Sequence, residues 1–241
     1  MLLALSLLSL AATGQVRVER TLDKGWRFTR EDDPAFAAAA CDDASWQAVT
    51  LPHDWAIYGP FSVDNDLHNT AIVQDGQTEA MEHAGRTGGL PFEGTGWYRL
   101  ALDIDRTPGL HRYTLLFDGA MSHARVYVNG REACYWPNGY NSFWFDATPY
   151  LREGRNTLAV RLENLPESSR WYPGAGLYRN VHLIRTEAAH VPVWGTQITT
   201  PVATRAYADV RQTTRLAVPE GRSLADYTFL TELRDAAGRV V

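Results

Sequence analysis

Short segments of alternating apolar and polar residues, each bounded by turn residues, are the feature that most limits how this chain can fold. The clearest segment covers residues 97–104, where apolar side chains take every second position from Tyr98 onward and Arg99 and Asp103 lie between them. A period of two is typical of a β-strand with one buried and one solvated face. We therefore expect Arg99 on the outer face of a sheet.

Similar patterns predict further strands with no helical repeat between them. The expected strands cover residues 112–118, 124–129, 157–163 and 180–186, followed by 191–198, 213–218 and 226–233. Asn129-Gly130 is typical of a two-residue hairpin turn. Only residues 33–41, an alanine-rich stretch with Pro34 near its start, are expected to be helical. Frequent short strands predict an all-β antiparallel sandwich rather than a parallel α/β sheet.

Two changes of pattern suggest how the chain is organised. Residues 51–95 are rich in Pro, Gly, Asp, Asn and His and have no stable period. A stretch of this length without regular structure is usually functional. A second change near Ala188 predicts a boundary between domains at residues 15–188 and 189–241. A β-sandwich of the immunoglobulin size takes ~100 residues, so we expect the second domain to be incomplete here.

The N-terminus resembles an export signal. Residues 2–12 are apolar except for two serines, and Ala12-Thr13-Gly14 is a small-x-small cleavage site. This predicts a signal peptide at residues 1–14 and a secreted or periplasmic protein that begins at Gln15. The alternative is a buried first strand or helix. No second apolar run reaches membrane length, so we expect no membrane span.

Charge and cysteine content limit the partners. Lys and Arg number 23 against 28 Asp and Glu, a net charge of -5, which argues against a nucleic-acid partner. The two cysteines, Cys41 and Cys134, are too few for a disulfide framework, and both a disulfide and two free thiols stay open. Neither cysteine has metal-type neighbours, and we expect no metal and no cofactor.

Six short motifs follow one another between residues 26 and 184. They are WQAVTLPHDW at 46–55, GTGWYR at 94–99, FDGA with ARVYVNG at 117–130, GYNSFWFDAT at 139–148, NTLAVRLEN at 156–164 and RWYPGAGLYR at 170–179. Each motif alone is weak. In this order and spacing they resemble the N-terminal part of glycoside hydrolase family 2, the β-galactosidase-like enzymes.

This resemblance implies a jelly-roll, galactose-binding-like sugar-binding domain followed by the start of an immunoglobulin-like sandwich. In the family, two catalytic glutamates lie on a C-terminal (β/α)8 barrel, which takes ~250 residues. Because this chain has no room for the barrel, we assign no catalytic residue within it. The expected function is the non-catalytic N-terminal portion of an exported glycosidase that hydrolyses O-glycosyl bonds. Its expected partners are a β-galactoside or related glycoside and the missing C-terminal catalytic barrel.

Two other classes of protein stay open. A free-standing carbohydrate-binding module would need an exposed aromatic platform and a complete fold that ends near Ala188. A structural or adhesive β-sandwich would need no ligand at all. Saturable binding of a glycan would separate these two classes.

Candidate substrate contacts come from two regions. The resemblance places Ser169, Arg170 and Trp171 in a loop near the family's catalytic pocket, where guanidinium and indole groups suit a sugar. Packing of the sandwich edge is the alternative role for these aromatic side chains. In the long loop, Arg86 lies in a Gly-rich segment, and we expect it at the pocket rim with Asp64 and Asn65.

Two further patterns have a structural alternative. Asp64-Asn65-Asp66 lacks the terminal Glu of a calcium-binding EF-hand loop, which favours a solvated turn. His53-Asp54 resembles an acid–base pair, but neighbours in a strand point apart, so bonding within the loop is the favoured role.

Overall fold

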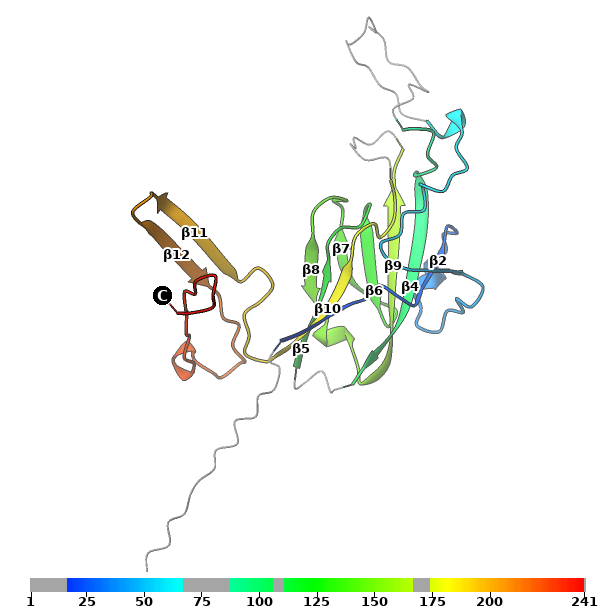
Figure 1. Ribbon diagram of the computed structural model, residues 1–241. Helices are drawn as coiled ribbons and strands as arrows, with labels where there is room; N and C mark the ends of the chain where they lie inside the picture. The colour runs from blue at the N-terminus through cyan, green and yellow to red at the C-terminus, as the bar shows by residue number, and fades with distance from the viewer. Residues whose placement is uncertain (1–16, 67–86, 106–110, 167–173, 241) are drawn as a thin grey trace, which may run out of the picture. The chain divides into compact units, whose positions relative to one another are not determined.

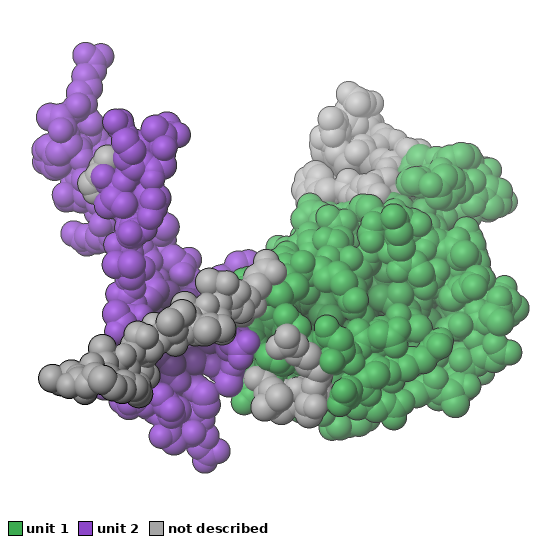
Figure 2. Space-filling view, turned by 60° about the horizontal axis from the view of Figure 1, so that its bottom comes forward, with its two compact units in different colours: residues 1–186 green, residues 187–241 purple. Residues whose placement is uncertain are grey.

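The computed structural model describes residues 17–66, 87–105, 111–166 and 174–240. The chain divides into two compact units, Met1–Thr186 and Glu187–Val241, which Figure 2 colours separately. The described residues are organised in antiparallel sheets, so the all-β prediction is confirmed. The predicted signal peptide lies outside the described residues.

Unit 1 is built from two sheets (Figure 1). The six-stranded sheet has the order β3-β2-β4-β9-β6-β7. Its strands are β2 (Trp26–Thr29), β3 (Gln47–Val49), β4 (Gly94–Ile104), β6 (Ala124–Val128), β7 (Arg131–Trp136) and β9 (Gly154–Asn164). The four-stranded sheet has the order β1-β10-β5-β8. Its strands are β1 (Arg17–Thr21), β5 (His111–Phe117), β8 (Phe143–Asp146) and β10 (Val181–Glu187).

The core of unit 1 follows the alternation in the strands. The inward side chains of β4, β5, β9 and β10 belong to one buried cluster, which includes Leu100, Leu115, Val160 and Val181. Asn129 and Gly130 have positive φ angles of 51° and 83° and join β6 to β7. The predicted hairpin turn is therefore confirmed. Short 3₁₀ turns occur at η1 (Pro34–Ala37), η2 (Val63–Asn65) and η3 (Thr148–Tyr150).

The outer face of the six-stranded sheet differs from the prediction. Arg99 is only 2% exposed, because residues 33–44 cross over it. Trp46, Trp97 and Ala159 form a second apolar cluster on this face, with Phe36 packed against it. Arg99 was expected in solvent, and that prediction is wrong because alternation within one strand cannot report a covering segment.

The helix predicted at residues 33–41 is also wrong. Only Pro34–Ala37 forms a short 3₁₀ helix, which Asp33 caps by accepting a hydrogen bond from the Ala35 amide. The helix ends at Ala37, and the next residue, Ala38, has an extended backbone (ψ 140°). Arg99 Nη1 donates to the carbonyls of Phe36 (2.5 Å) and Ala38 (3.0 Å). These carbonyls therefore bond a buried guanidinium instead of continuing a helix.

Unit 2 contains one hairpin, β11 (Thr196–Ala203) with β12 (Ala208–Thr214), and a 3₁₀ turn, η4 (Leu224–Asp226). The strands predicted at 191–198 and 213–218 are displaced, and residues 227–233 form no strand. An apolar alternation without a partner strand gives no ladder of hydrogen bonds, which is the reason for that failure. The predicted identities of the two domains stay predictions.

Two further features concern the described residues. Cys41 and Cys134 are free thiols, and burial raises the pKa of each. Where the chain is described, its helices are single 3₁₀ turns, and none has the length and apolar character needed to cross a membrane.

Candidate functional site

Residues 53–55 of the LPHDW motif and residues 174–177, the GAGL part of the second motif, are far apart in the sequence but lie side by side in unit 1. The His53 amide donates to the Leu177 carbonyl (2.9 Å), and the Trp55 amide donates to the Ala175 carbonyl (3.1 Å). This pairing brings the last described residues of the second motif against residues 53–55. The two motifs therefore form one structural unit.

Gly176 permits this close approach. Its φ is +123°, and a Cβ atom there would lie 2.4 Å from the His53 carbonyl oxygen and 2.6 Å from Tyr98 Oη. Such a backbone conformation is essentially restricted to glycine. Gly176 is therefore required by the contact between the motifs.

His53 and Asp54 are held by separate partners. His53 Nδ1 lies 2.7 Å from Tyr98 Oη, and the imidazole packs against Phe28 with ring centroids 4.9 Å apart. Asp54 Oδ1 accepts hydrogen bonds from the amides of Ala56 (2.8 Å) and Ala175 (3.2 Å). These contacts support the structural role rather than an acid–base pair.

Burial shifts the pKa of His53 and that of its partner Tyr98. Desolvation lowers the pKa of His53, and the nearby Asp54 carboxylate opposes that shift. Burial also raises the pKa of Tyr98 well above its ordinary value. Both side chains are therefore neutral near pH 7, as suits a hydrogen-bonded pair inside a core.

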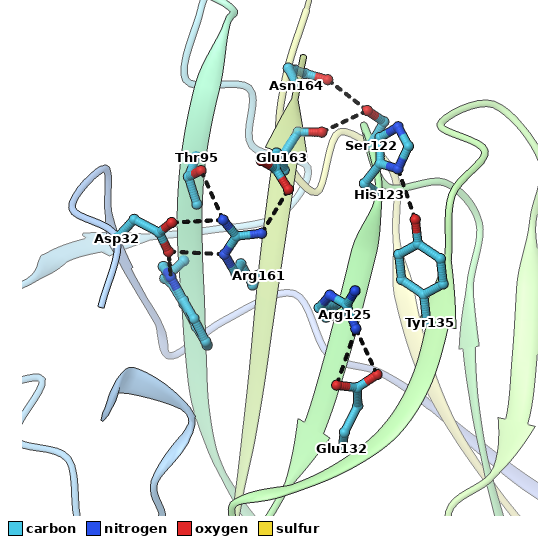
Figure 3. A network of polar contacts seen from close by, with 11 residues as sticks. Asp32, Thr95, Ser122, His123, Arg125, Glu132, Tyr135, Arg161, Glu163 and Asn164 are labelled. Atoms are coloured by element: carbon cyan, nitrogen blue, oxygen red, sulfur yellow. Dashed lines mark hydrogen bonds and ion pairs between the residues drawn. The ribbon is translucent and has the colours of Figure 1, made fainter. Parts of the chain in front are cut away.

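Asn164 connects three segments at the same end of unit 1 (Figure 3). The side chain is 2% exposed, and its Oδ1 accepts a hydrogen bond from Ser122 Oγ (2.9 Å). Its Nδ2 donates to the carbonyls of Phe92 (3.0 Å) and Gly174 (3.3 Å). Asn164 thus joins the last part of the long loop at residues 51–95 to the chain that follows residues 167–173, which contain candidate contacts.

Asn164 was missed by the sequence reasoning, although a signal was present. Asn156 and Asn164 share the inward face of β9 with Leu158, Val160 and Leu162. A polar amide at an apolar position predicts a buried hydrogen-bonding hub. Asn156 shows the same behaviour at the other end of β9, where its Nδ2 donates to the carbonyls of Arg152 (2.7 Å) and Gly154 (2.8 Å).

The described candidate contacts have different surroundings. Asp64 and Asn65 belong to η2, where Asp64 is exposed. Asn65 Nδ2 donates to the carbonyls of Pro60 (3.0 Å) and Gly89 (3.0 Å), so its amide ties two parts of the long loop together. Arg86, Ser169, Arg170 and Trp171 lie outside the described residues.

A polar network crosses the outer face of the six-stranded sheet near this end (Figure 3). Arg161 donates to both carboxylate oxygens of Asp32 (2.9 and 2.7 Å) and to Glu163 (2.9 Å). The hydrogen bond from Arg161 lowers the pKa of Asp32, and Asp32 in turn raises the pKa of Arg161. The network fastens the chain at Asp32 to the sheet.

Within the described ranges, no group of three His, Cys, Asp or Glu side chains is arranged to hold a metal ion.

Comparison with known proteins gives consistent matches. The family described as "Glycosyl hydrolases family 2, sugar binding domain" matches residues 19–187. A β-galactosidase of Bacteroides ovatus is 37% identical over 218 residues, which cover 90% of this chain and 24% of that protein. The chain therefore spans about a quarter of that relative's length.

Solved structures show the same relationship. A glycosyl hydrolase family 2 member from Bacteroides cellulosilyticus matches with a TM-score of 0.68 and 35% identity, over 82% of this chain and 24% of that one. A β-glucuronidase of Bacteroides uniformis matches with a TM-score of 0.65 and 26% identity, over 83% of this chain and 22% of that one.

Proposed function

The chain belongs to glycoside hydrolase family 2, as its six motifs predicted, and we propose that it is the non-catalytic N-terminal part of an exported glycosidase of β-galactosidase type. One observation carries this proposal. The similarity to a β-galactosidase extends over nine-tenths of this chain but only about a quarter of the relative. The chain thus corresponds to one portion of a larger hydrolase.

In this proposal, catalysis depends on groups outside the chain. Retaining hydrolysis of a glycoside needs two carboxyl groups about 5–5.5 Å apart, one as acid/base and one as nucleophile. We propose that a (β/α)8 barrel in the same polypeptide supplies both. Unit 1 would contribute one wall of the substrate pocket through Arg86, Ser169, Arg170 and Trp171, with exposed Asp64 at the rim. Asn65, whose Nδ2 ties two parts of the long loop together, would lie at the same rim.

The surface of unit 2 supports a larger assembly. A single two-stranded hairpin is marginally stable in water. In addition, many large apolar side chains of unit 2 are more than half exposed. They are Trp194, Ile198, Tyr207, Val210, Leu224, Phe229, Leu230, Leu233 and Val240. Exposed apolar surface of this extent usually marks an interaction site. We propose that further parts of the same polypeptide cover it.

The test uses the native polypeptide from the source cell. An antibody raised against residues 17–241 would capture it, and its mass, its N-terminal sequence and its hydrolysis of p-nitrophenyl glycosides would be measured. We expect a mass several times 26.9 kDa, an N-terminus at Gln15, and faster hydrolysis of the β-galactoside than of the β-glucuronide.

Each part of the proposal has its own contrary result. Faster hydrolysis of the β-glucuronide would refute the β-galactosidase assignment alone. Retention of Met1 in the mature protein would refute export through a cleaved signal. A captured polypeptide of 26.9 kDa that hydrolyses neither glycoside would refute the glycosidase, and would favour a free-standing carbohydrate-binding module.

A further inference from the structure

Three arginines line one pocket on the outer face of the six-stranded sheet. They are Arg27 of β2, Arg99 of β4 and Arg155 of β9, and the pocket measures about 290 Å³. This volume is close to the lower limit of about 300 Å³ for small-molecule sites. The pocket therefore suits a ligand of only a few heavy atoms.

The strand register explains why a pocket forms here. Arg27 lies directly opposite Arg99, and Ala101, two residues farther along β4 on the same face, lies opposite Thr157. The methyl group of Ala101 fills little of the space beside two long side chains. The segment at residues 33–44 crosses over Arg99 and provides part of the lining. A small residue on the sheet and a segment that crosses it thus leave a concave site.

Arg99 is held firmly but does not use all of its donors. Its Nε donates to Asp43 (2.8 Å), and its Nη1 donates to two carbonyls of the crossing segment (2.5 and 3.0 Å). Nη2 carries two N–H groups but makes only a long hydrogen bond, to the Cys41 carbonyl (3.4 Å), within the described ranges. A buried N–H without a good partner is unfavourable. This nitrogen therefore favours a ligand that accepts hydrogen bonds.

The other two guanidinium groups have no carboxylate partner among the residues that the structure describes. Arg27 makes a long hydrogen bond to the Trp46 carbonyl (3.4 Å), and the Arg155 side chain is exposed. Asp103 lies opposite Arg155 in the register of β4 and β9, but it does not line the pocket. Both groups are therefore available to a ligand.

The lining is positive, although the whole chain has a net charge of -5. Three guanidinium groups face one carboxylate, that of Asp43, and Thr157 adds a hydroxyl. The planar fork of a guanidinium binds the oxygens of phosphate through strong, charge-assisted hydrogen bonds. A small oxyanion is thus the class of ligand that matches this lining.

Asp43 narrows the choice among oxyanions. One of its carboxylate oxygens accepts the hydrogen bond from Arg99 Nε, and the side chain is 33% exposed. A carboxylate repels an anion such as sulfate, which has only acceptor oxygens at neutral pH. It can instead accept a hydrogen bond from the P–O–H group that phosphate keeps near pH 7. The pocket should therefore prefer phosphate to sulfate.

We propose that this pocket is a binding site for a phosphate group. Arg27, Arg99 and Arg155 donate to its oxygens, and Asp43 accepts a hydrogen bond from its protonated oxygen. The bound group would also link β9 to the segment at residues 33–44. The inference goes beyond the proposed function, because hydrolysis of a glycoside requires no phosphate.

The test is a calorimetric titration of the full chain with inorganic phosphate and with sulfate at pH 7, with chloride holding the ionic strength constant. We expect saturation with phosphate and about tenfold weaker binding of sulfate, and Asp43→Asn should reduce this preference. Glycerol 2-phosphate, titrated in the same way, distinguishes the source of the group. Equal or tighter binding would support a phosphate ester as the ligand, and weaker binding would support the free ion.

Arg27→Gln and Arg155→Gln should each weaken phosphate binding about tenfold. Arg152→Gln is the matched control, because Arg152 carries the same charge three residues from Arg155, is exposed and does not line the pocket. It should change the affinity less than about twofold, since screening by salt weakens the effect of a charge outside the site. The thermal midpoint of each variant would confirm that it folds.

The two cysteines locate the bound ligand. Cys41 lines the pocket, whereas Cys134 on β7 does not. Phosphate should therefore slow alkylation of Cys41 by N-ethylmaleimide and leave Cys134 unchanged, as measured by peptide mass spectrometry. Three results would overturn the proposal: no saturation with phosphate, unchanged affinity in both arginine variants, or sulfate binding as tight as phosphate. None of them depends on hydrolysis, so they are distinguishable from failure of the proposed function.

Discussion

Replacement of Arg99 by methionine tests whether one buried guanidinium holds the segment that covers the six-stranded sheet. Methionine keeps an unbranched apolar stem, although a shorter one, and removes the N–H donors of the guanidinium. In the native structure, Arg99 Nε donates to Asp43 (2.8 Å), and Nη1 donates to Phe36 (2.5 Å) and Ala38 (3.0 Å). The variant would remove the donor of this carboxylate and of the Phe36 carbonyl, while the Ala38 carbonyl would keep its hydrogen bond from the Cys41 amide (3.1 Å).

The expected loss follows from the burial of each partner. Removing one member of a buried ion pair costs about 3–5 kcal/mol. Arg99 is 2% exposed, but the Asp43 side chain is 33% exposed and can be rehydrated. We therefore expect the low end of that range, a loss of about 3 kcal/mol in the free energy of unfolding.

Arg27→Met provides the matched control on the adjacent strand. Arg27 lies directly opposite Arg99 in the register of β2 and β4, but its Nη1 makes only a long hydrogen bond, to the Trp46 carbonyl (3.4 Å), among the described residues. Its replacement should cost less than about 1 kcal/mol. Urea denaturation followed by tryptophan fluorescence measures both losses, and limited proteolysis at residues 33–44 reports detachment of the segment.

The anchoring role of Arg99 would be refuted if Arg99→Met were no less stable than Arg27→Met and its segment at residues 33–44 were cleaved no faster. The covering segment would then be held by the apolar contacts of Trp46 and Phe36 alone. A loss near 3 kcal/mol together with faster cleavage in this segment would confirm the anchoring role of Arg99.

Three further predictions concern the contact between the two motifs. Gly176→Ala should lower the free energy of unfolding by about 3 kcal/mol or more, because the new Cβ would collide with the His53 carbonyl. Gly154→Ala is the control and should lower it by only about 1–2 kcal/mol, since its Cβ meets open space. Urea denaturation measures both losses. Asn164→Leu should cost about 3 kcal/mol, because two buried carbonyls lose their donor, and a loss below about 1 kcal/mol would contradict the hub. His53→Gln should flatten the fall in stability between pH 7.5 and 5, measured by urea denaturation at each pH.

The sign of the pH effect follows from the lowered pKa of His53. Below its ordinary value of 6.5, the unfolded chain takes up a proton that folded His53 binds only at lower pH. The native protein therefore loses this contribution to stability as pH falls from 6.5 toward the lowered pKa. His123→Gln, which removes a histidine from an exposed contact with Tyr135, is the control. An equal flattening in that variant would contradict the assignment to His53.

The strand pattern could be predicted in unit 1 because burial on one face imposes alternation on each strand. Residues 97–104 show this for β4, and Asn129-Gly130 defines the hairpin of β6 and β7 because few residue pairs tolerate two positive φ angles. The same reasoning failed at residues 226–233, where alternation is present but no neighbouring strand pairs with it.

Candidate site residues were less accessible to this reasoning. The motifs identify His53, Asp54 and the glycines, but they do not say that residues 53–55 pair with residues 175–177. Asn164 stands out only as a polar residue on the apolar face of β9, and its bond to the Phe92 carbonyl, 72 positions away, has no signal in the sequence. Arg30 has no such signal either, since it bonds the Pro91 carbonyl 61 positions away.

The sequence by itself determined the family and the turn between β6 and β7, and it located five of the ten strands of unit 1, because alternation, turn chemistry and motif order are local properties of the chain. The strands β1, β2, β3, β7 and β8 were not predicted. Only the tertiary structure decided which polar groups are buried and which segments meet. Arg99 is buried by a segment about sixty residues earlier, and Gly176 is required by a backbone more than a hundred residues away. Such contacts depend on the packing of distant segments, which no local pattern encodes.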